Sequence, residues 1–183
     1  DPKSGEFTEG FAERGFLPEA LLNMLAMLGW NDGTGQELMS IQDLIQKFDL
    51  SRVNHSGAVF DFEKAKWFNH QYLQAMTSDE LMPLVKPYFK EAGIETQDEA
   101  LRTAITLVKE RCHLLSDFVA QAGFFFKTPE TIDTASILPK WKAEHATFFE
   151  ALPTAWVDEE AVTPAAMEAL FLQRAEAQGI KKG

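Results

Sequence analysis

The sequence has a single cysteine, no long hydrophobic run and few basic residues. The one cysteine, Cys112, excludes an internal disulfide framework and a paired-thiol zinc site, and it fits a reducing compartment. No stretch approaches the about 18 consecutive apolar residues of a membrane span, and residues 1–15 lack the charged-then-apolar order of a signal peptide. We therefore expect a cytoplasmic protein without membrane contact.

Positive charge is scarce as well. The 183 residues include 17 Lys plus Arg against 28 Asp plus Glu, which gives a net charge of -11. A summed negative field disfavours indiscriminate binding to polyanions, so we expect no DNA binding and only local contacts to any nucleic acid. The 45% of hydrophobic residues is enough to bury a core, so disorder over most of the length is not expected.

No catalytic constellation stands out in the sequence. Cys112 and His113 are the only tempting nucleophile and base, but adjacent residues on a helix point about 100° apart and cannot serve each other directly. Because Cys112 falls on an apolar stripe, we interpret it as a buried structural thiol. The sequence predicts no catalytic residue in this chain.

The spacing of histidines and glycines in the sequence predicts neither a metal site nor a nucleotide site. The histidines stand too far apart in sequence to form a ligand-spaced pair: His55, His70, His113 and His145. Gly33 and Gly35 lack both the spacing and the following lysine of a phosphate-binding loop. We therefore expect no metal ion and no cofactor in this chain.

Hydrophobic periodicity predicts a mainly α-helical fold. The helices are expected at about residues 18–28, 41–48, 62–76, 78–92, 97–115, 138–152 and 164–178. Ser40 and Asp61 are suited to cap the second and third of them. Two further starts match the capping box, in which a hydroxyl and a carboxylate satisfy free amides: Thr77 with Glu80, and Thr96 with Glu99.

One face of the helix expected over residues 97–115 is apolar. The residues that share it are Leu101, Ile105, Val108, Cys112 and Leu115. Arg102, Lys109 and Arg111 lie mostly outside this face. These basic groups are therefore available to meet a partner.

Three segments, in order and spacing, carry a more specific signal. They are residues 15–23 continuing to Leu28-Gly29-Trp30; residues 56–61 followed by Lys64, Lys66, Trp67, Asn69 and Tyr72; and Lys109-Glu110-Arg111. With these segments the chain resembles the carboxy-terminal half of bacterial-type glutamyl-tRNA synthetases. The resemblance extends from about Gly15 to Gly183.

The resemblance implies two regions. Residues 1–76 would form a lead-in loop and a helical stem-contact region, and residues 77–183 a first helical anticodon-binding domain. In that family a separate amino-terminal domain, with two signature motifs absent here, activates glutamate using ATP and Mg²⁺. The chain is thus expected to be a non-catalytic part of a glutamate–tRNA ligase that binds tRNA(Glu). No sustained heptad pattern appears, and a monomer is expected.

The resemblance also suggests a residue for reading the anticodon. Arg111 matches the family position whose arginine contacts the third anticodon base, and Lys109 is expected beside it. A guanidinium offers parallel N–H donors to O2 and N3 of cytosine, whereas guanine presents donors of its own. The alternative is a helix-surface arginine paired with Glu110 or Asp117.

Two other lysines are candidates for tRNA backbone contacts. Lys64 and Lys66 stand near the start of their helix, where a solvated helix face would explain them almost equally well. Between them, Ala65 replaces the larger aliphatic residue usual in the family. For the whole chain, the alternative function is a helical protein-interaction module without RNA binding.

Overall fold

The computed structural model describes residues 9–54, 57–158 and 163–180. Within these residues every regular element is a helix, which confirms the mainly α-helical fold predicted from the sequence. His55, one of the four histidines, lies outside the described residues. The chain divides into two compact units, residues 1–129 and residues 130–183.

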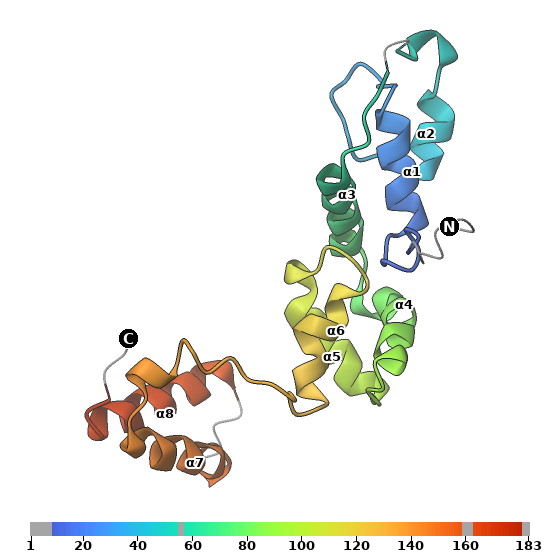
Figure 1. The fold of residues 1–183 in the computed structure, drawn as a ribbon. Coiled ribbons are helices and arrows are strands. Elements are labelled where there is room, and N and C mark those ends of the chain that lie inside the picture. The colour runs from blue at the N-terminus through green and yellow to red at the C-terminus, as the bar shows by residue number, and fades with distance from the viewer. Residues whose placement is uncertain (1–8, 55–56, 159–162, 181–183) are drawn as a thin grey trace, which may run out of the picture. The chain divides into compact units, whose positions relative to one another are not determined.

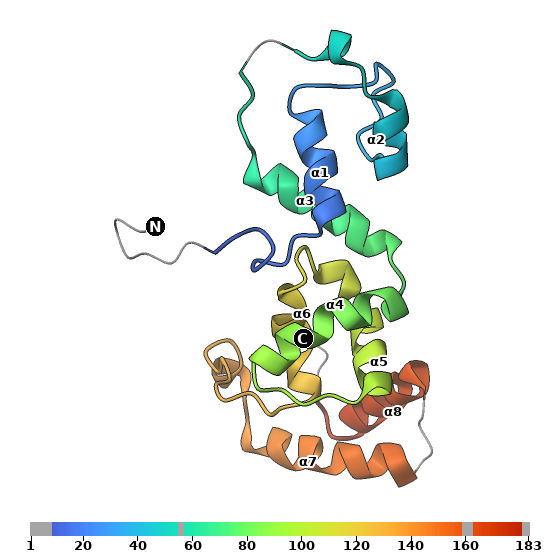
Figure 2. The same ribbon diagram turned by 90° about the vertical axis from the view of Figure 1, so that its right-hand side faces the viewer.

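The first unit holds six α-helices and three short 3-10 turns among its described residues. They are α1 (Pro18–Met27), α2 (Ile41–Lys47), η1 (Leu50–Arg52), α3 (Phe62–Ala75), α4 (Ser78–Glu91), α5 (Asp98–Val108), η2 (Lys109–Arg111), α6 (Asp117–Ala122) and η3 (Gly123–Phe125). Helix α1 packs against both α2 and α3, and α4, α5 and α6 pack together (Figures 1 and 2).

Hydrophobic burial joins α1 to α3. Phe16 and Met24 form a cluster with Ala65 and Phe68 of α3, and Ala65 is only 1% exposed. The small side chain at residue 65 therefore lets the two helices come close. Asp61 caps α3 as predicted, because its carboxylate accepts hydrogen bonds from the first amides of the helix.

Polar residues of the resemblance motifs tie the same helices together. The Asn23 carboxamide accepts from the Met39 amide at 2.9 Å and donates to the Glu37 carbonyl at 3.0 Å. The Tyr72 hydroxyl donates to the Met39 carbonyl at 2.6 Å, and burial raises the pKa of this phenol. These side chains thus satisfy the backbone of the loop before α2.

Helix α2 confirms its predicted cap. The Ser40 hydroxyl and the Asp43 carboxylate satisfy each other's backbone amides in a capping box. The apolar stripe of α2 is less buried than its spacing suggests, because Leu44 is 7% exposed but Ile45 is 74% exposed. Leu44 is the one residue of this short helix that reaches the core, where it packs with Trp30 and Met39.

The main core of the first unit lies among α4, α5 and α6. It includes Leu73, Leu81, Val85, Phe89, Leu101, Ile105, Val108, Cys112, Leu115 and Phe118. The capping box predicted for Thr77 and Glu80 is confirmed at the start of α4. All five residues predicted to share the apolar face near α5 are buried.

Two expectations about α5 are wrong. The residue before the helix is Gln97, with no side-chain capping bond, and Glu99 pairs instead with Arg102. The helix also ends at Val108 rather than near residue 115. Beyond Val108 the backbone bonds to side chains of α3, and these tertiary partners replace the helical hydrogen bonds of the next turn.

The second unit contains η4 (Leu138–Lys140), α7 (Ala143–Asp158) and α8 (Pro164–Ala177). The helix predicted from residue 138 begins only at Ala143, because the residues before it form the 3-10 turn. The predicted start and end of α8 are confirmed, with Thr163 capping it and Gly179 following it at φ +70°. Phe148, Leu152 and Ala175 form the core of this unit.

Gly15 lies where the lead-in loop meets the segment before α6. Its carbonyl accepts from the Leu115 amide at 3.0 Å, and its φ is +92°. A Cβ added to Gly15 would lie 2.7 Å from the backbone nitrogens of Leu115 and Ser116. Both the backbone conformation and the space therefore require glycine.

We predict that Gly15→Ala destabilises the first unit by about 2 kcal/mol or more, because the methyl group adds a backbone clash to an unfavourable φ. Native-state amide hydrogen exchange of the first unit measures the loss. Gly57→Ala is the control, since nothing lies within 4 Å of its added Cβ. Equal exchange rates in the two variants would contradict the prediction.

Candidate functional site

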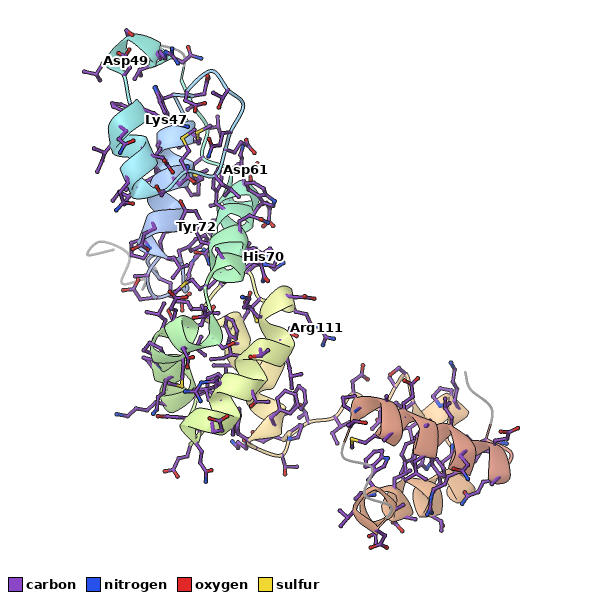
Figure 3. The ribbon with its side chains drawn as sticks, turned by 180° about the vertical axis from the view of Figure 1, so that it is seen from behind. Lys47, Asp49, Asp61, His70, Tyr72 and Arg111 are labelled. Carbon is purple, nitrogen blue, oxygen red and sulfur yellow. The ribbon has the colours of Figure 1, made fainter. Side chains whose placement is uncertain are left out.

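Arg111 ends the short turn η2 that follows α5. Its side chain is exposed and extends away from the helices (Figure 3). It makes no hydrogen bond or ion pair with any residue that the structure describes, and the Asp117 carboxylate is occupied by the backbone amides of His113 and Leu114. The pairing of Arg111 with Asp117, considered from the sequence, is not present.

Lys109, two residues earlier, faces α3 instead of solvent. Its ammonium group donates to the carbonyls of Gln74 at 2.8 Å and Met76 at 2.6 Å, at the end of α3. In return, the Gln74 side chain donates to the Lys109 carbonyl at 2.7 Å. Lys109 thus satisfies carbonyls that the helix end leaves without partners. Two of the three N–H donors of its ammonium group are engaged in these bonds. A contact of Lys109 with the anticodon stays a prediction.

The residues that follow η2, Cys112 and His113, are also bonded to side chains of α3. The Asn69 side chain, which is fully buried, donates to the His113 carbonyl at 2.6 Å and accepts from the Leu17 amide at 2.7 Å. His70 Nδ1 lies 2.8 Å from the Cys112 carbonyl oxygen and donates to it. Side chains from α3 therefore fix the backbone on both sides of Arg111.

The structure brings together two histidines that the sequence analysis kept apart. The rings of His70 and His113 stack with centroids 4.6 Å apart and an interplanar angle of 26°. Their separation in sequence gave no signal of this contact, since it depends on how α3 packs against the turn. The pair lies directly beside the residue that follows Arg111.

Cys112 is the structural thiol that its spacing predicted. It is 0% exposed within the main core, and burial raises the pKa of the thiol to about 12. A thiol with so high a pKa is not a nucleophile at neutral pH. Its side chain packs in the core and donates a weak hydrogen bond to the Val108 carbonyl, with the sulfur 3.5 Å from the oxygen.

Lys64 is exposed and Lys66 is half-buried, and both lysines are engaged with carboxylates. Lys64 Nζ lies 2.6 Å from Glu37 Oε1, and Lys66 Nζ lies 3.0 Å from Glu63 Oε1. Lys66 also lies over the Phe62 ring, 5.1 Å from its centroid. Exposed ion pairs of this kind are weak, so a phosphate could replace either carboxylate. Contact of these lysines with a tRNA backbone stays a prediction.

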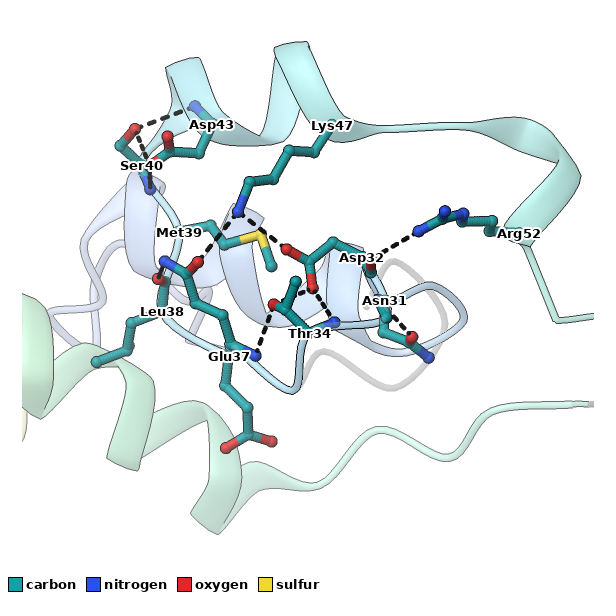
Figure 4. Close-up of polar contacts among 12 residues, drawn as sticks. Asn31, Asp32, Thr34, Glu37, Leu38, Met39, Ser40, Asp43, Lys47 and Arg52 are labelled. Carbon is teal, nitrogen blue, oxygen red and sulfur yellow. Dashed lines mark hydrogen bonds and ion pairs between the residues drawn. The ribbon is translucent and has the colours of Figure 1, made fainter.

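A second polar cluster surrounds Asp32 in the loop before α2 (Figure 4). The Asp32 carboxylate accepts from the Thr34 hydroxyl at 2.6 Å and from Lys47 Nζ at 2.9 Å, while Arg52 donates to its carbonyl at 2.6 Å. The Thr34 hydrogen bond and then Lys47 hold the pKa of Asp32 well below its usual range. Asp49 completes a shallow pocket of about 280 Å³. The cations here are satisfied within the cluster.

The second unit has an open apolar pocket of about 930 Å³ beside α8. Its walls include Ile137, Trp141, Phe149, Phe171 and Ile180. Across the described residues there is no group of three histidine, cysteine or carboxylate side chains placed to hold a metal ion. Nor is any helix in that part of the chain both long and apolar enough to cross a membrane.

Comparison with known families matches both parts of the chain. Residues 80–183 match a family model described as an anticodon binding domain, and residues 4–67 match one for the catalytic domain of class I tRNA synthetases for E and Q. Relatives named glutamate–tRNA ligase are 43% identical to this chain over 80% of its length. The chain belongs to the glutamate–tRNA ligase family. The predicted resemblance is confirmed, and a protein-interaction module without RNA binding is not favoured.

Individual relatives agree with this family membership. The glutamate–tRNA ligase of Porphyromonas gingivalis is 43% identical over 80% of the chain and 29% of that protein. That of Flavobacterium johnsoniae is 40% identical over 89% of the chain and 32% of the protein. A solved glutamate tRNA ligase structure from Elizabethkingia meningosepticum superimposes with a TM-score of 0.84 at 35% identity, covering 99% of this chain and 36% of that one. The chain thus spans about a third of the length of these ligases.

The matched ranges leave a gap between residues 67 and 80, and the boundary predicted at residues 76 and 77 lies in it. This position separates α3 from α4. Both helices belong to the first compact unit, whose end is near residue 129. The boundary between a stem-contact region and an anticodon-binding domain at residues 76 and 77 stays a prediction.

We predict that Asn69→Ala destabilises the first unit by about 3 kcal/mol, because the buried Leu17 amide and His113 carbonyl both lose their partner. Amide hydrogen exchange should accelerate across the first unit and stay unchanged in the second. Gln71→Ala on the same helix is the control and should change stability by less than about 0.5 kcal/mol. A small effect of Asn69→Ala would show that α3 does not hold the turn.

The Asp32 cluster gives a prediction about pH. A carboxylate whose folded pKa is lowered contributes stability above its usual value of 3.8 and loses that contribution as the pH falls. Wild type should therefore be more stable than Asp32→Asn at neutral pH, and the gap should shrink below pH 3.8. Thermal unfolding of both proteins across this range tests the sign, and a gap that widens in acid would refute it.

Proposed function

We propose that this chain is the tRNA-binding part of a glutamate–tRNA ligase and that Arg111 contacts the third anticodon base of tRNA(Glu). The observation that carries the proposal is the exposed guanidinium without any partner among the described residues, inside the range that matches an anticodon binding domain. A guanidinium held on a fixed turn can present two parallel N–H donors to one base edge.

The chemistry of the turn supports discrimination between bases. Cytosine offers O2 and N3 as adjacent acceptors, whereas guanine offers N1–H and N2–H donors that oppose the guanidinium. The bonds from α3 fix the backbone before and after Arg111, so the turn itself loses little freedom on binding. With a net charge of -11, the chain gains little from phosphates in general, and the base contact matters correspondingly more.

The attachment of glutamate to tRNA(Glu) belongs, in this proposal, to the whole ligase. ATP and Mg²⁺ would be held by residues of the ligase outside this chain, since the relatives are about three times as long as it is. The described residues of this chain offer neither a phosphate loop nor a metal-binding cluster. We also propose that Lys64 and Lys66 contact the tRNA backbone and that the ligase is a cytoplasmic monomer.

We predict that the chain binds an anticodon stem–loop RNA with cytosine at the third anticodon position about tenfold more tightly than the same RNA with guanine. Arg111→Ala should remove this preference, because no other group then reads the base edge. Fluorescence anisotropy titrations at a fixed salt concentration measure both affinities.

The matched control is Lys90→Ala, which removes one exposed positive charge from α4. It should weaken binding to both RNAs equally and keep the preference for cytosine. A preference that survives Arg111→Ala would overturn the assignment of Arg111. No binding of either RNA by wild type would overturn the proposed function itself.

A further inference from the structure

The residues around Cys112 alternate between the core and the surface. Cys112 has an extended backbone, with φ -98° and ψ 125°, and its side chain is fully buried. Side chains on either side of an extended residue point to the opposite face. Arg111 and His113 are accordingly both exposed. The turn therefore exposes a guanidinium and an imidazole two residues apart.

His113 has one covered face. The His70 ring stacks on it at a centroid distance of 4.6 Å, and His70 is itself fixed by its bond to the Cys112 carbonyl. The His113 side chain makes no hydrogen bond with any residue that the structure describes, and its stack with His70 is the ring contact present there. His113 is therefore an exposed imidazole with one face stacked on a fixed ring.

We propose that His113 is a stacking platform for the base whose edge Arg111 contacts. This inference rests on the proposed function and adds a second recognition element to the same site. Unstacked RNA bases are commonly bound by an aromatic ring on one face together with hydrogen bonds to the pairing edge. A guanidinium and a supported ring two residues apart provide both contacts for one nucleotide.

The surroundings favour a base over a phosphate as the group that meets His113. The Asp117 carboxylate lies at the His113 amide, with Oδ2 2.8 Å from the nitrogen, and it would repel a phosphate there. The whole chain also carries a net charge of -11. Stacking depends on the ring face and needs no net positive charge.

A double-mutant cycle between protein and RNA tests the contact. The RNA is the anticodon stem–loop with cytosine at the third anticodon position, and its partner carries an abasic nucleotide there. His113→Ala should weaken binding of the cytosine RNA about tenfold and leave binding of the abasic RNA unchanged within about twofold. An abasic nucleotide at the second anticodon position should leave the effect of His113→Ala intact.

Two further variants separate stacking from other roles. His113→Phe keeps a ring without a donor or charge and should bind within about twofold of wild type, whereas a phosphate contact would make it as weak as His113→Ala. Phe124→Ala, which removes a 56% exposed ring beyond the other end of α6, should leave the affinity unchanged. Circular dichroism should show the same helix content in all variants.

Each outcome decides a separate statement. If His113→Ala weakens the abasic and cytosine RNAs equally, or has no effect, the stacking proposal is overturned. The proposed function survives that result as long as Arg111→Ala still removes the preference for cytosine. If wild type binds no stem–loop RNA, the proposed function fails and the stacking proposal fails with it.

Discussion

The buried carboxamide of Asn69 is the interaction on which the arrangement of the first unit depends. It lies on the apolar face of α3, between Phe68 and Leu73, where an unpaired polar group would be costly. There it accepts from the Leu17 amide at the start of α1 and donates to the His113 carbonyl after η2. One side chain thus sets the position of α3 relative to two segments far from it in sequence. A helix that carried only apolar groups on this face could slide, whereas these bonds fix its register.

The consequence for Arg111 is that its backbone is determined by α3 rather than by α5. Helix α5 ends at Val108, and the next residues exchange hydrogen bonds with Gln74 and His70 instead of continuing the helix. On a continued helix, Arg111 and His113 would point about 200° apart, by two steps of about 100°. The extended backbone at Cys112 instead brings both side chains to the outer face. The tertiary bonds of α3 therefore create the pairing of a guanidinium with an aromatic ring.

The sequence predicts those features that are decided within a few residues. The caps at Ser40, Asp61 and Thr77 need a side chain and an amide two or three positions apart, and all three are present. The box expected at Thr96 fails because Glu99 has a competing cation in Arg102. The end of α5 and the stacked histidines depend on α3, more than 30 residues away, and no local pattern encodes them. The exposed position of Arg111 was nevertheless expected, since burial of Leu101, Ile105 and Val108 leaves it on the outside.

For the proposed anticodon site, the distribution of charge favours selectivity between bases over high overall affinity for RNA. Four basic side chains form ion pairs with carboxylates of the same chain, which largely neutralise their charges: Lys47, Lys64, Lys66 and Arg102. Arg111 differs from these cations in having no such partner among the described residues. Since phosphate contacts supply most non-specific affinity, an acidic chain with these four cations paired disfavours unrelated RNAs. In the proposed function, a matching base at Arg111 would add directional hydrogen bonds without raising that non-specific affinity. Because few unpaired positive charges lie elsewhere in the described part of the chain, a single guanidinium can contribute a larger share of the difference in affinity between a matching RNA and an unrelated one.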